Sequence, residues 1–183
     1  MVDKHNRSFN YLRLAVNEYC NLRCIYCMPE EGLPLRNKNE LLSTKEIKKL
    51  IKISEQLGVS KIRFTGGEPL LRKDISELVK YAVNLNGIKS VNLTTNGILL
   101  NKYLKDLQLA GLSGINISLD TLRSDRFIKI TRRNNLRQVL DNIQLAIKSK
   151  IPSIKINVVA MRDFNHDELM DFVNLTIEND ITV

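Results

Sequence analysis

The apolar residues of this chain are spaced in two different patterns, and the two patterns alternate along the sequence. Short runs of apolar residues predict buried or half-buried strands, and longer stretches with apolar residues three or four positions apart predict helices. The predicted strands cover residues 11–16, 61–65, 90–95, 114–119 and 155–160. The predicted helices cover residues 43–57, 75–82, 102–110, 125–130, 136–148 and 165–173. Strands that alternate with helices in this way predict an α/β fold with a parallel sheet and right-handed crossovers.

Start and stop signals mark two of these helices. Ser43 with Glu46 three residues later has the pattern of a capping box, and Gly58 is typical of a helix end. Asn165 with Glu168 predicts a similar start for the last helix. The side chains expected on the buried faces of these two helices are Ile47, Leu50, Ile51, Leu57, Leu169, Phe172 and Val173. The 183 residues are interpreted as one domain, residues 1–183, long enough to bury a core.

Three cysteines stand within eight residues, at Cys20, Cys24 and Cys27, with the aromatic Tyr26 before the last. Thiolates are the ligands of iron–sulfur clusters, and three of them on a four-iron cluster leave one iron open for a small molecule. A structural zinc site wants four protein ligands, and neither histidine of the chain stands at a suitable spacing. Plain buried thiols are the other alternative, but the polar neighbours make a poor core pattern.

Further polar motifs come where strands are predicted to end. Gly66-Gly67 follows the second strand, Thr94 and Thr95 end the third, and Ser118 lies near the end of the fourth. Because sites of parallel α/β folds gather at the carboxyl ends of their strands, these residues are expected to lie beside the cysteine loop.

The net charge is +8, from 28 basic and 20 acidic residues, which favours an anionic partner. Much of the excess is expected on solvated helix faces, and Arg132-Arg133 is expected at the surface. No nucleic-acid-binding signature is present, and no apolar run is long enough to cross a bilayer. The polar segment 1–10 has no secretory pattern, so a reducing cytoplasm is expected, without nucleic-acid or membrane partners.

The motifs together resemble the radical S-adenosylmethionine (SAM) enzymes, and within them the GTP 3′,8-cyclases of molybdenum cofactor biosynthesis. The segments that carry this resemblance are Arg13-Leu14-Ala15-Val16, the cysteine loop with Cys27-Met28-Pro29-Glu30, Arg63-Phe64-Thr65-Gly66-Gly67-Glu68-Pro69-Leu70, Thr94-Thr95-Asn96-Gly97, Ser118-Leu119-Asp120 and Lys155-Ile156-Asn157. The resemblance implies a partial (β/α)6 barrel whose sixth strand would start near Ile181, so that the chain is truncated at the start of that strand.

The resemblance also implies cofactors and site residues. A [4Fe-4S] cluster on Cys20, Cys24 and Cys27 would keep one open iron, to which SAM binds before reductive cleavage to a 5′-deoxyadenosyl radical. Neither step needs an acid or base side chain. The implied SAM-binding residues are Tyr26, Gly67 and Ser118, and the implied GTP-binding residues are Arg13, Arg63, Thr94 and Lys155. From the residues alone, Gly66-Gly67 could be a plain turn, Ser118 a strand-end hydroxyl, and the basic side chains could face outward or pair with Glu68 and Asp120.

The implied activity converts GTP to (8S)-3′,8-cyclo-7,8-dihydroguanosine 5′-triphosphate, with an external electron donor and a possible homodimer. Members of this family bind a second cluster through three further cysteines, whereas this chain has none beyond Cys27. It is therefore expected to be a fragment that cannot complete the cyclisation alone, with an exposed apolar edge along its fifth strand. Two alternatives remain: another radical SAM enzyme acting on a peptide or small molecule, and a non-catalytic metal-binding assembly module.

Overall fold

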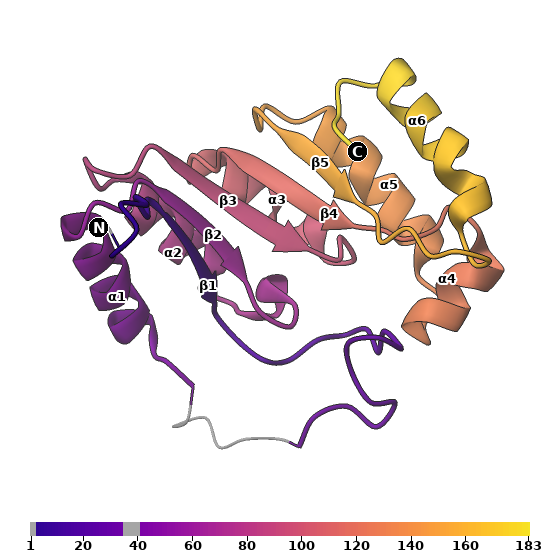
Figure 1. Cartoon of the computed structure of the whole chain (residues 1–183), viewed down its shortest axis with the longest axis horizontal. Coiled ribbons are helices and arrows are strands. Elements are labelled where there is room, and N and C mark those ends of the chain that lie inside the picture. The colour runs from indigo at the N-terminus through magenta and orange to yellow at the C-terminus, as the bar shows by residue number, and fades with distance from the viewer. Residues whose placement is uncertain (1–2, 35–40) are drawn as a thin grey trace.

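The computed structural model of the chain describes residues 3–34 and 41–183. Its strands form one parallel sheet in the order in which they occur along the chain (Figure 1). They are β1 (Tyr11–Ala15), β2 (Lys61–Thr65), β3 (Ser90–Thr95), β4 (Gly114–Ser118) and β5 (Ile154–Asn157). The sheet is open rather than closed on itself, as expected of a partial barrel. The predicted α/β class and parallel strand direction are confirmed.

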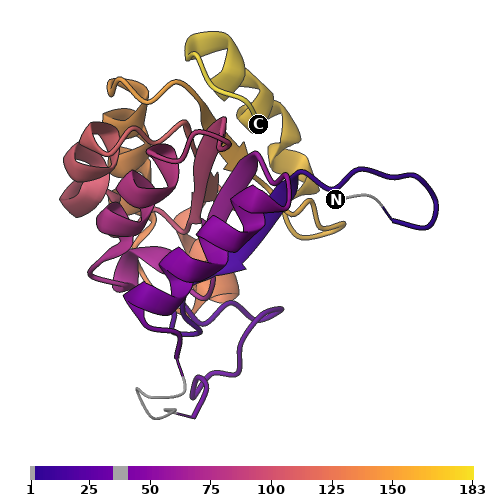
Figure 2. The same cartoon turned by 90° about the vertical axis from the view of Figure 1, so that its left-hand side faces the viewer.

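Helices follow the strands, and most of them cover one face of the sheet (Figure 1). They are α1 (Thr44–Gln56), α2 (Ile75–Val83), α3 (Leu100–Leu109), α4 (Ser124–Thr131), α5 (Leu136–Ile147) and α6 (Leu169–Glu178), with short 3-10 turns η2 (Pro69–Leu71) and η3 (His166–Glu168). Helices α1, α2, α3 and α5 pack side by side in this order, on one side of the sheet (Figure 2). Within the described ranges, no helix is both long and apolar enough to cross a membrane.

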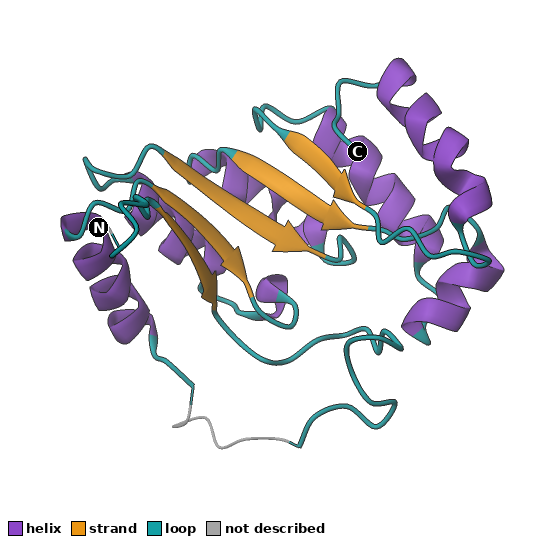
Figure 3. Cartoon of the chain, viewed as in Figure 1, coloured by secondary structure: helices purple, strands orange, loops and turns teal. Residues whose placement is uncertain are grey.

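Side-chain alternation gives the sheet two different faces. The face toward the helices is apolar, and Phe64 and Leu93 on it are completely buried. Burial of one such side chain stabilises the fold by about 1.5–3 kcal/mol. The opposite face is polar, because alternate strand positions carry Arg13, Lys61, Arg63, Asn92, Thr94, Asn116, Ser118, Lys155 and Asn157. The strands in Figure 3 run with their carboxyl ends toward the loop that carries the cysteines.

The two predicted helix starts have different outcomes. Ser43 and Glu46 form the expected capping box at α1. The predicted cap on Asn165 is wrong, because the Asn165 amide donates instead to the carbonyl oxygens of Asp120 (2.6 Å) and Val159 (2.9 Å). The Glu168 carboxylate is likewise buried away from its own helix, where it accepts hydrogen bonds from Thr121 and Leu122. Both side chains connect the start of α6 to the loop after β4.

Several apolar side chains predicted to be buried are exposed. In α1, Ile47 and Ile51 are fully buried, whereas Leu50 and Leu57 lie on the solvent side. In α6 only Phe172 is buried, and the expected positions at Leu169 and Val173 are about half exposed. Helix α6 lies beyond the last strand at the sheet edge, so it has less sheet to cover than the other helices (Figure 1).

The edge of β5 is partly paired. Thr182 forms a parallel bridge with Lys155, and its carbonyl accepts a hydrogen bond from the Ile156 amide (2.8 Å) while its amide donates to Ile154 (3.1 Å). The described sheet has five strands, and this isolated bridge at Thr182 lies next to Ile181, where a sixth strand was expected to start. The predicted exposed edge over Lys155–Ala160 is wrong at Lys155 and Ile156, because Thr182 pairs with the strand there.

Candidate cluster and nucleotide site

The cysteine loop runs from the end of β1 along the carboxyl ends of the strands to α4 (Figure 1, Figure 3). Its backbone is held there by the Arg23 amide, which donates to the Thr131 carbonyl (3.0 Å), and the Ile25 amide, which donates to the Ile130 carbonyl (2.9 Å). Carbonyls in the last turn of a helix have no partner inside the helix, so the end of α4 offers ready acceptors. The loop is therefore attached to the fold by main-chain bonds, independently of the cysteine side chains.

The three thiols are free and differ in exposure. Cys20 and Cys24 are partly buried, and Cys27 is exposed. Burial raises the pKa of Cys20. Burial, together with the negative charges of Cys20, Asp120 and Cys27, raises the pKa of Cys24 to about 12. The Cys20 sulfur accepts weak hydrogen bonds from the Leu22 amide (3.4 Å) and from the Asn96 side chain (3.8 Å). The three sulfurs thus lie within electrostatic reach of one another.

This donor set fits an iron–sulfur cluster better than a single metal ion. In the described part of the chain, no three His, Cys, Asp or Glu side chains converge closely enough to hold one ion. Cysteines that hold a cluster each bind a different iron, so they must surround a common volume rather than meet at a point. Three thiols on one loop are the donor set that such a cluster takes, whereas a structural zinc site needs a fourth protein ligand.

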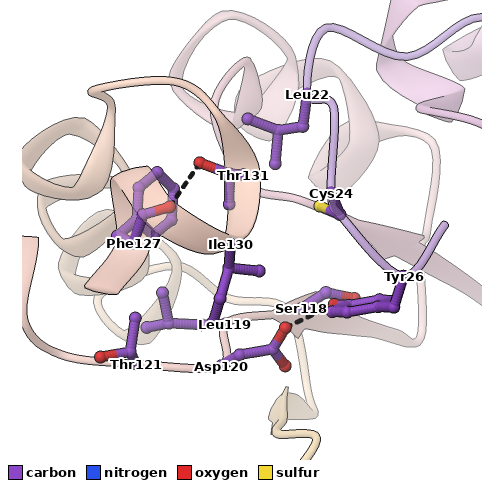
Figure 4. A pocket seen from close by; sticks show the side chains of 10 residues that line it. All are labelled: Leu22, Cys24, Tyr26, Ser118, Leu119, Asp120, Thr121, Phe127, Ile130 and Thr131. Carbon is purple, nitrogen blue, oxygen red and sulfur yellow. Dashed lines mark hydrogen bonds between the residues drawn. The ribbon is translucent and has the colours of Figure 1, made fainter. Parts of the chain in front are cut away.

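Tyr26 and Ser118 line a small pocket of about 30 Å³ between the cysteine loop and the end of β4 (Figure 4). The Tyr26 hydroxyl donates a short hydrogen bond to Asp120, whose other carboxylate oxygen accepts from the Val159 amide (2.9 Å). Burial and this hydrogen bond raise the pKa of Tyr26. Asp120 therefore links the cysteine loop, β4 and the segment after β5. Tyr26 and Ser118 were expected at this site, whereas this linking role of Asp120 was not expected.

The Gly66-Gly67 turn is required by packing within the chain. A Cβ atom on Gly67 would lie 2.2 Å from the Tyr19 carbonyl oxygen, and one on Gly66 would lie 2.4 Å from that of Asn17. Gly66 also has a φ of +145°, which L side chains rarely adopt. The backbone that approaches these glycines closely is the segment leading into Cys20. A side chain at Gly67 would displace the cysteine loop, whatever else that glycine contacts.

Glu68 is a buried carboxylate that connects the ends of β2 and β3. It accepts hydrogen bonds from the Thr95 hydroxyl (2.7 Å) and from the amides of Leu70 (3.0 Å) and Asn96 (2.7 Å). Burial raises its pKa. Since the Asn96 side chain also contacts the Cys20 sulfur, Glu68 helps to hold in place a residue that touches the cysteine loop. One alternative was that Glu68 pairs with Arg13, Arg63 or Lys155, and it forms no ion pair with these three described residues.

The four expected GTP-binding residues share the polar face of the sheet. Arg13 stands opposite Arg63 in the register of β1 and β2, and the Arg63 guanidinium donates to the Thr94 hydroxyl (3.4 Å). Arg63 Nε is buried and has no hydrogen-bond partner in the described residues. Lys155 lies on the same face, opposite Asn116. A cavity of about 420 Å³ opens at the start of these strands, lined by Asn10, Tyr11, Lys61, Arg63, Ser90 and Asn92.

Arg23 and Arg132 are two residues whose contacts sequence reasoning missed. Arg23 donates to the carbonyls of Cys20 (2.6 Å) and Leu22 (2.9 Å) within its own loop. Arg132 was expected at the surface, which is wrong, because it is partly buried against the cysteine loop. The left-handed turn at the end of α4 that brings it there has no signal in the sequence.

The fold and this loop define a class of protein. The model of the radical SAM superfamily matches residues 14–176, and the chain belongs to this superfamily. A solved structure agrees on the fold: Streptococcus suis SuiB bound to S-adenosylmethionine superposes with a TM-score of 0.78 at 23% identity, over 94% of this chain and 39% of SuiB. The predicted family and fold class are confirmed.

Relatives of higher identity are GTP 3′,8-cyclases. That of Alkaliphilus metalliredigens is 45% identical over 183 residues, and that of Lactiplantibacillus plantarum is 47% identical over 181 residues. Molybdenum cofactor biosynthesis protein 1 of Drosophila melanogaster is 49% identical over 183 residues. These matches cover 99–100% of this chain but 57%, 54% and 32% of the respective relatives. The chain thus spans about half the length of the two bacterial relatives.

Proposed function

We propose that this chain provides the cluster-binding and SAM-binding region, and part of the GTP-binding region, of a GTP 3′,8-cyclase. The reaction would convert GTP to (8S)-3′,8-cyclo-7,8-dihydroguanosine 5′-triphosphate in molybdenum cofactor biosynthesis. The proposal rests on the identity of 43–49% to the cyclases and to the Drosophila protein, together with the polar sheet face below the cysteine loop.

That polar face is the observation that carries the choice of substrate. Arg13 and Arg63 are neighbours in the register, so two like charges lie side by side without a carboxylate between them. Like charges directly opposite one another on neighbouring strands destabilise a sheet, and a bound polyphosphate would supply their partner. Thr94 and Lys155 continue the same face toward the cysteine loop. These four residues would hold GTP.

Each remaining residue has a role at the carboxyl end of the sheet. Cys20, Cys24 and Cys27 would hold a [4Fe-4S] cluster, which when bound with SAM supplies a 5′-deoxyadenosyl radical for hydrogen abstraction. Tyr26, Gly67 and Ser118 would contact SAM, since Tyr26 and Ser118 line one pocket and Gly67 lies beneath the loop. The side chains position the reactants and exclude water, and none acts as acid or base.

The setting of the proposed activity follows from the same chemistry. Free thiols and an oxygen-sensitive cluster suit a reducing compartment, so we place the protein in the cytoplasm. An external donor would deliver the electron. We treat residues 1–183 as one radical SAM domain, and a homodimer remains part of the proposal, with no nucleic-acid or membrane partner.

The test is anaerobic reconstitution of this chain with iron and sulfide, followed by addition of SAM and a chemical reductant. We expect about four irons per chain, a brown chromophore, and formation of 5′-deoxyadenosine. Replacing Cys24 with Ala should abolish the iron content, the chromophore and the formation of 5′-deoxyadenosine. Cys20→Ala and Cys27→Ala should each give the same result.

Equilibrium dialysis against GTP and ATP then tests the choice of nucleotide. GTP should bind to the reconstituted chain more tightly than ATP. Zinc uptake without iron would favour an assembly module. Formation of 5′-deoxyadenosine without any nucleotide binding would favour a radical SAM enzyme with another substrate.

A further inference from the structure

Arg132 ends α4 in a left-handed backbone conformation (φ 55°), at a position where glycine is the usual residue. Its guanidinium Nη1 donates to the Arg23 carbonyl (2.9 Å) and more weakly to the Met28 carbonyl (3.4 Å). Arg23 immediately precedes Cys24, and Met28 immediately follows Cys27. One guanidinium from a distant part of the chain therefore joins both ends of the Cys24–Cys27 turn.

The turn that Arg132 holds is closed by its own backbone. The amides of Cys27 and Met28 both donate to the Cys24 carbonyl at 2.9 Å. The carbonyls on either side of the turn point outward to the arginine, while the Arg23 and Ile25 amides reach the end of α4. The shape of the turn thus depends on contacts made by α4, and these contacts need no metal.

The charge of Arg132 is not cancelled by a buried partner. Within residues 3–34 and 41–183, its ion pair is with Glu30 at 3.6 Å, and the Glu30 side chain is 77% exposed. A pair with such an exposed partner is strongly screened by water. A positive charge therefore remains beside the turn that carries two of the cysteines. Any electron added at this site would be stabilised by it.

We propose that Arg132 is a positioning residue that shapes the Cys24–Cys27 turn before a cluster binds, and whose charge favours the reduced state of the bound cluster. The second half of this inference rests on the proposed function. The first half concerns the chain alone, and it is tested without metal.

The first experiment measures hydrogen exchange in the cluster-free chain, by NMR or by mass spectrometry of the peptide that holds the cysteine loop. In Arg132→Gln, the amides of Cys27 and Met28 should exchange about tenfold faster, as expected for loss of a charge-assisted hydrogen bond. The matched control is Arg133→Gln, which removes the same charge from an exposed neighbour. Its guanidinium donates to the Arg132 carbonyl (2.7 Å) and not to the carbonyls of Arg23 or Met28, so this variant should exchange like the wild type. Equal exchange in the two variants would overturn the positioning role.

A second variant separates position from charge. Arg132→Lys keeps the charge but has no planar fork to reach two carbonyls, so exchange should still be accelerated. If Arg132→Gln does not fold, as judged by circular dichroism, Arg132→Lys carries the exchange test alone, and wild-type rates in it would refute the proposal.

The third measurement is the midpoint potential of the reconstituted cluster. It should fall in Arg132→Gln and stay near the wild-type value in Arg132→Lys and Arg133→Gln. An equal fall in Arg133→Gln would contradict a specific charge effect. Failure of the wild-type chain to take up iron would count against the proposed function, and the exchange result would still decide the positioning role.

Discussion

At the scale of single residues, burial controls how the cysteines react. Iodoacetamide attacks the thiolate, so its rate follows the ionised fraction of each thiol. Burial raises the pKa of Cys24 from 9.0 to about 12, so at neutral pH this thiol keeps its proton. We expect alkylation of Cys24 in the folded, cluster-free chain to rise about tenfold per pH unit up to pH 10.

The control for this prediction is the same chain unfolded in urea, where the rate at Cys24 should level off above about pH 9. Peptide mass spectrometry after a timed quench separates the three cysteines. The exposed Cys27 should react faster than Cys24 in the folded chain. A plateau at Cys24 below pH 9 in the folded chain would contradict the assigned burial.

Single residues also show which side-chain contacts can be predicted from the nearby sequence. The capping box of Ser43 and Glu46 could be predicted because all of its partners lie within four positions. Asn165 has the same local signal, but Asp120 and Val159 compete for its amide from other elements. Arg132 could not be predicted, since its acceptors lie more than 100 positions away.

At the scale of elements, Glu68 joins β2, β3 and the cysteine loop. Its carboxylate accepts hydrogen bonds from one hydroxyl and two amides and is 1% exposed. In Glu68→Gln the amide group must face an N–H of Leu70 or Asn96, whichever way it turns. A buried donor left unpaired costs about 1–3 kcal/mol.

Urea unfolding at pH 7 measures this loss of stability. The matched control is Glu77→Gln on α2, because the Glu77 side chain is 58% exposed and its ion pair with Lys48 lies at the surface. Such a surface change should stay within about 0.5 kcal/mol of the wild type. Equal stability of Glu68→Gln and the wild type would show that the carboxylate does not hold the two strand ends together.

Among the strands, the ranges of those with a neighbouring strand on both sides were predicted most accurately. The ranges of β2 and β3 agree with the apolar alternation, because both strands are flanked in the sheet and covered by helices. The fifth strand was predicted to reach Ala160 but ends at Asn157. After Asn157 the backbone of Val159 hydrogen-bonds the side chains of Asp120 and Asn165. The apolar residues that follow the strand therefore do not pair with a neighbouring strand, although they continue the apolar pattern.

At the scale of the whole molecule, the sequence could predict which residues follow which strand, and hence where the site lies. It could not predict what supports that site, because the contacts of α4 with the cysteine loop depend on how far the loop reaches across the sheet (Figure 1). The division of the sheet into an apolar and a basic polar face follows from side-chain alternation alone. That division leads to a prediction about anions.

Four cations stand on the polar face, at Arg13, Lys61, Arg63 and Lys155, and no carboxylate occupies a strand position on it. Charges of one sign along a hollow surface concentrate counter-ions there. We therefore expect inorganic triphosphate to bind to the cluster-free chain, without SAM or guanine. The affinity, measured by calorimetry, should fall as salt is raised from 0.05 to about 0.5 M, because screening weakens exposed charges.

Arg63→Gln should weaken this binding by roughly 10- to 100-fold, since a hydrogen bond to a charged group contributes about 1.5–3 kcal/mol. Arg63 is the informative position because its Nε is buried without a hydrogen-bond partner in the described residues, so an arriving phosphate would not have to break an existing bond there. Arg137→Gln removes the same charge from α5, where the side chain is 89% exposed and paired with Asp141, and it should bind triphosphate like the wild type. Equal weakening by both substitutions would mean that net charge alone attracts the anion, and that the polar face is not a binding site.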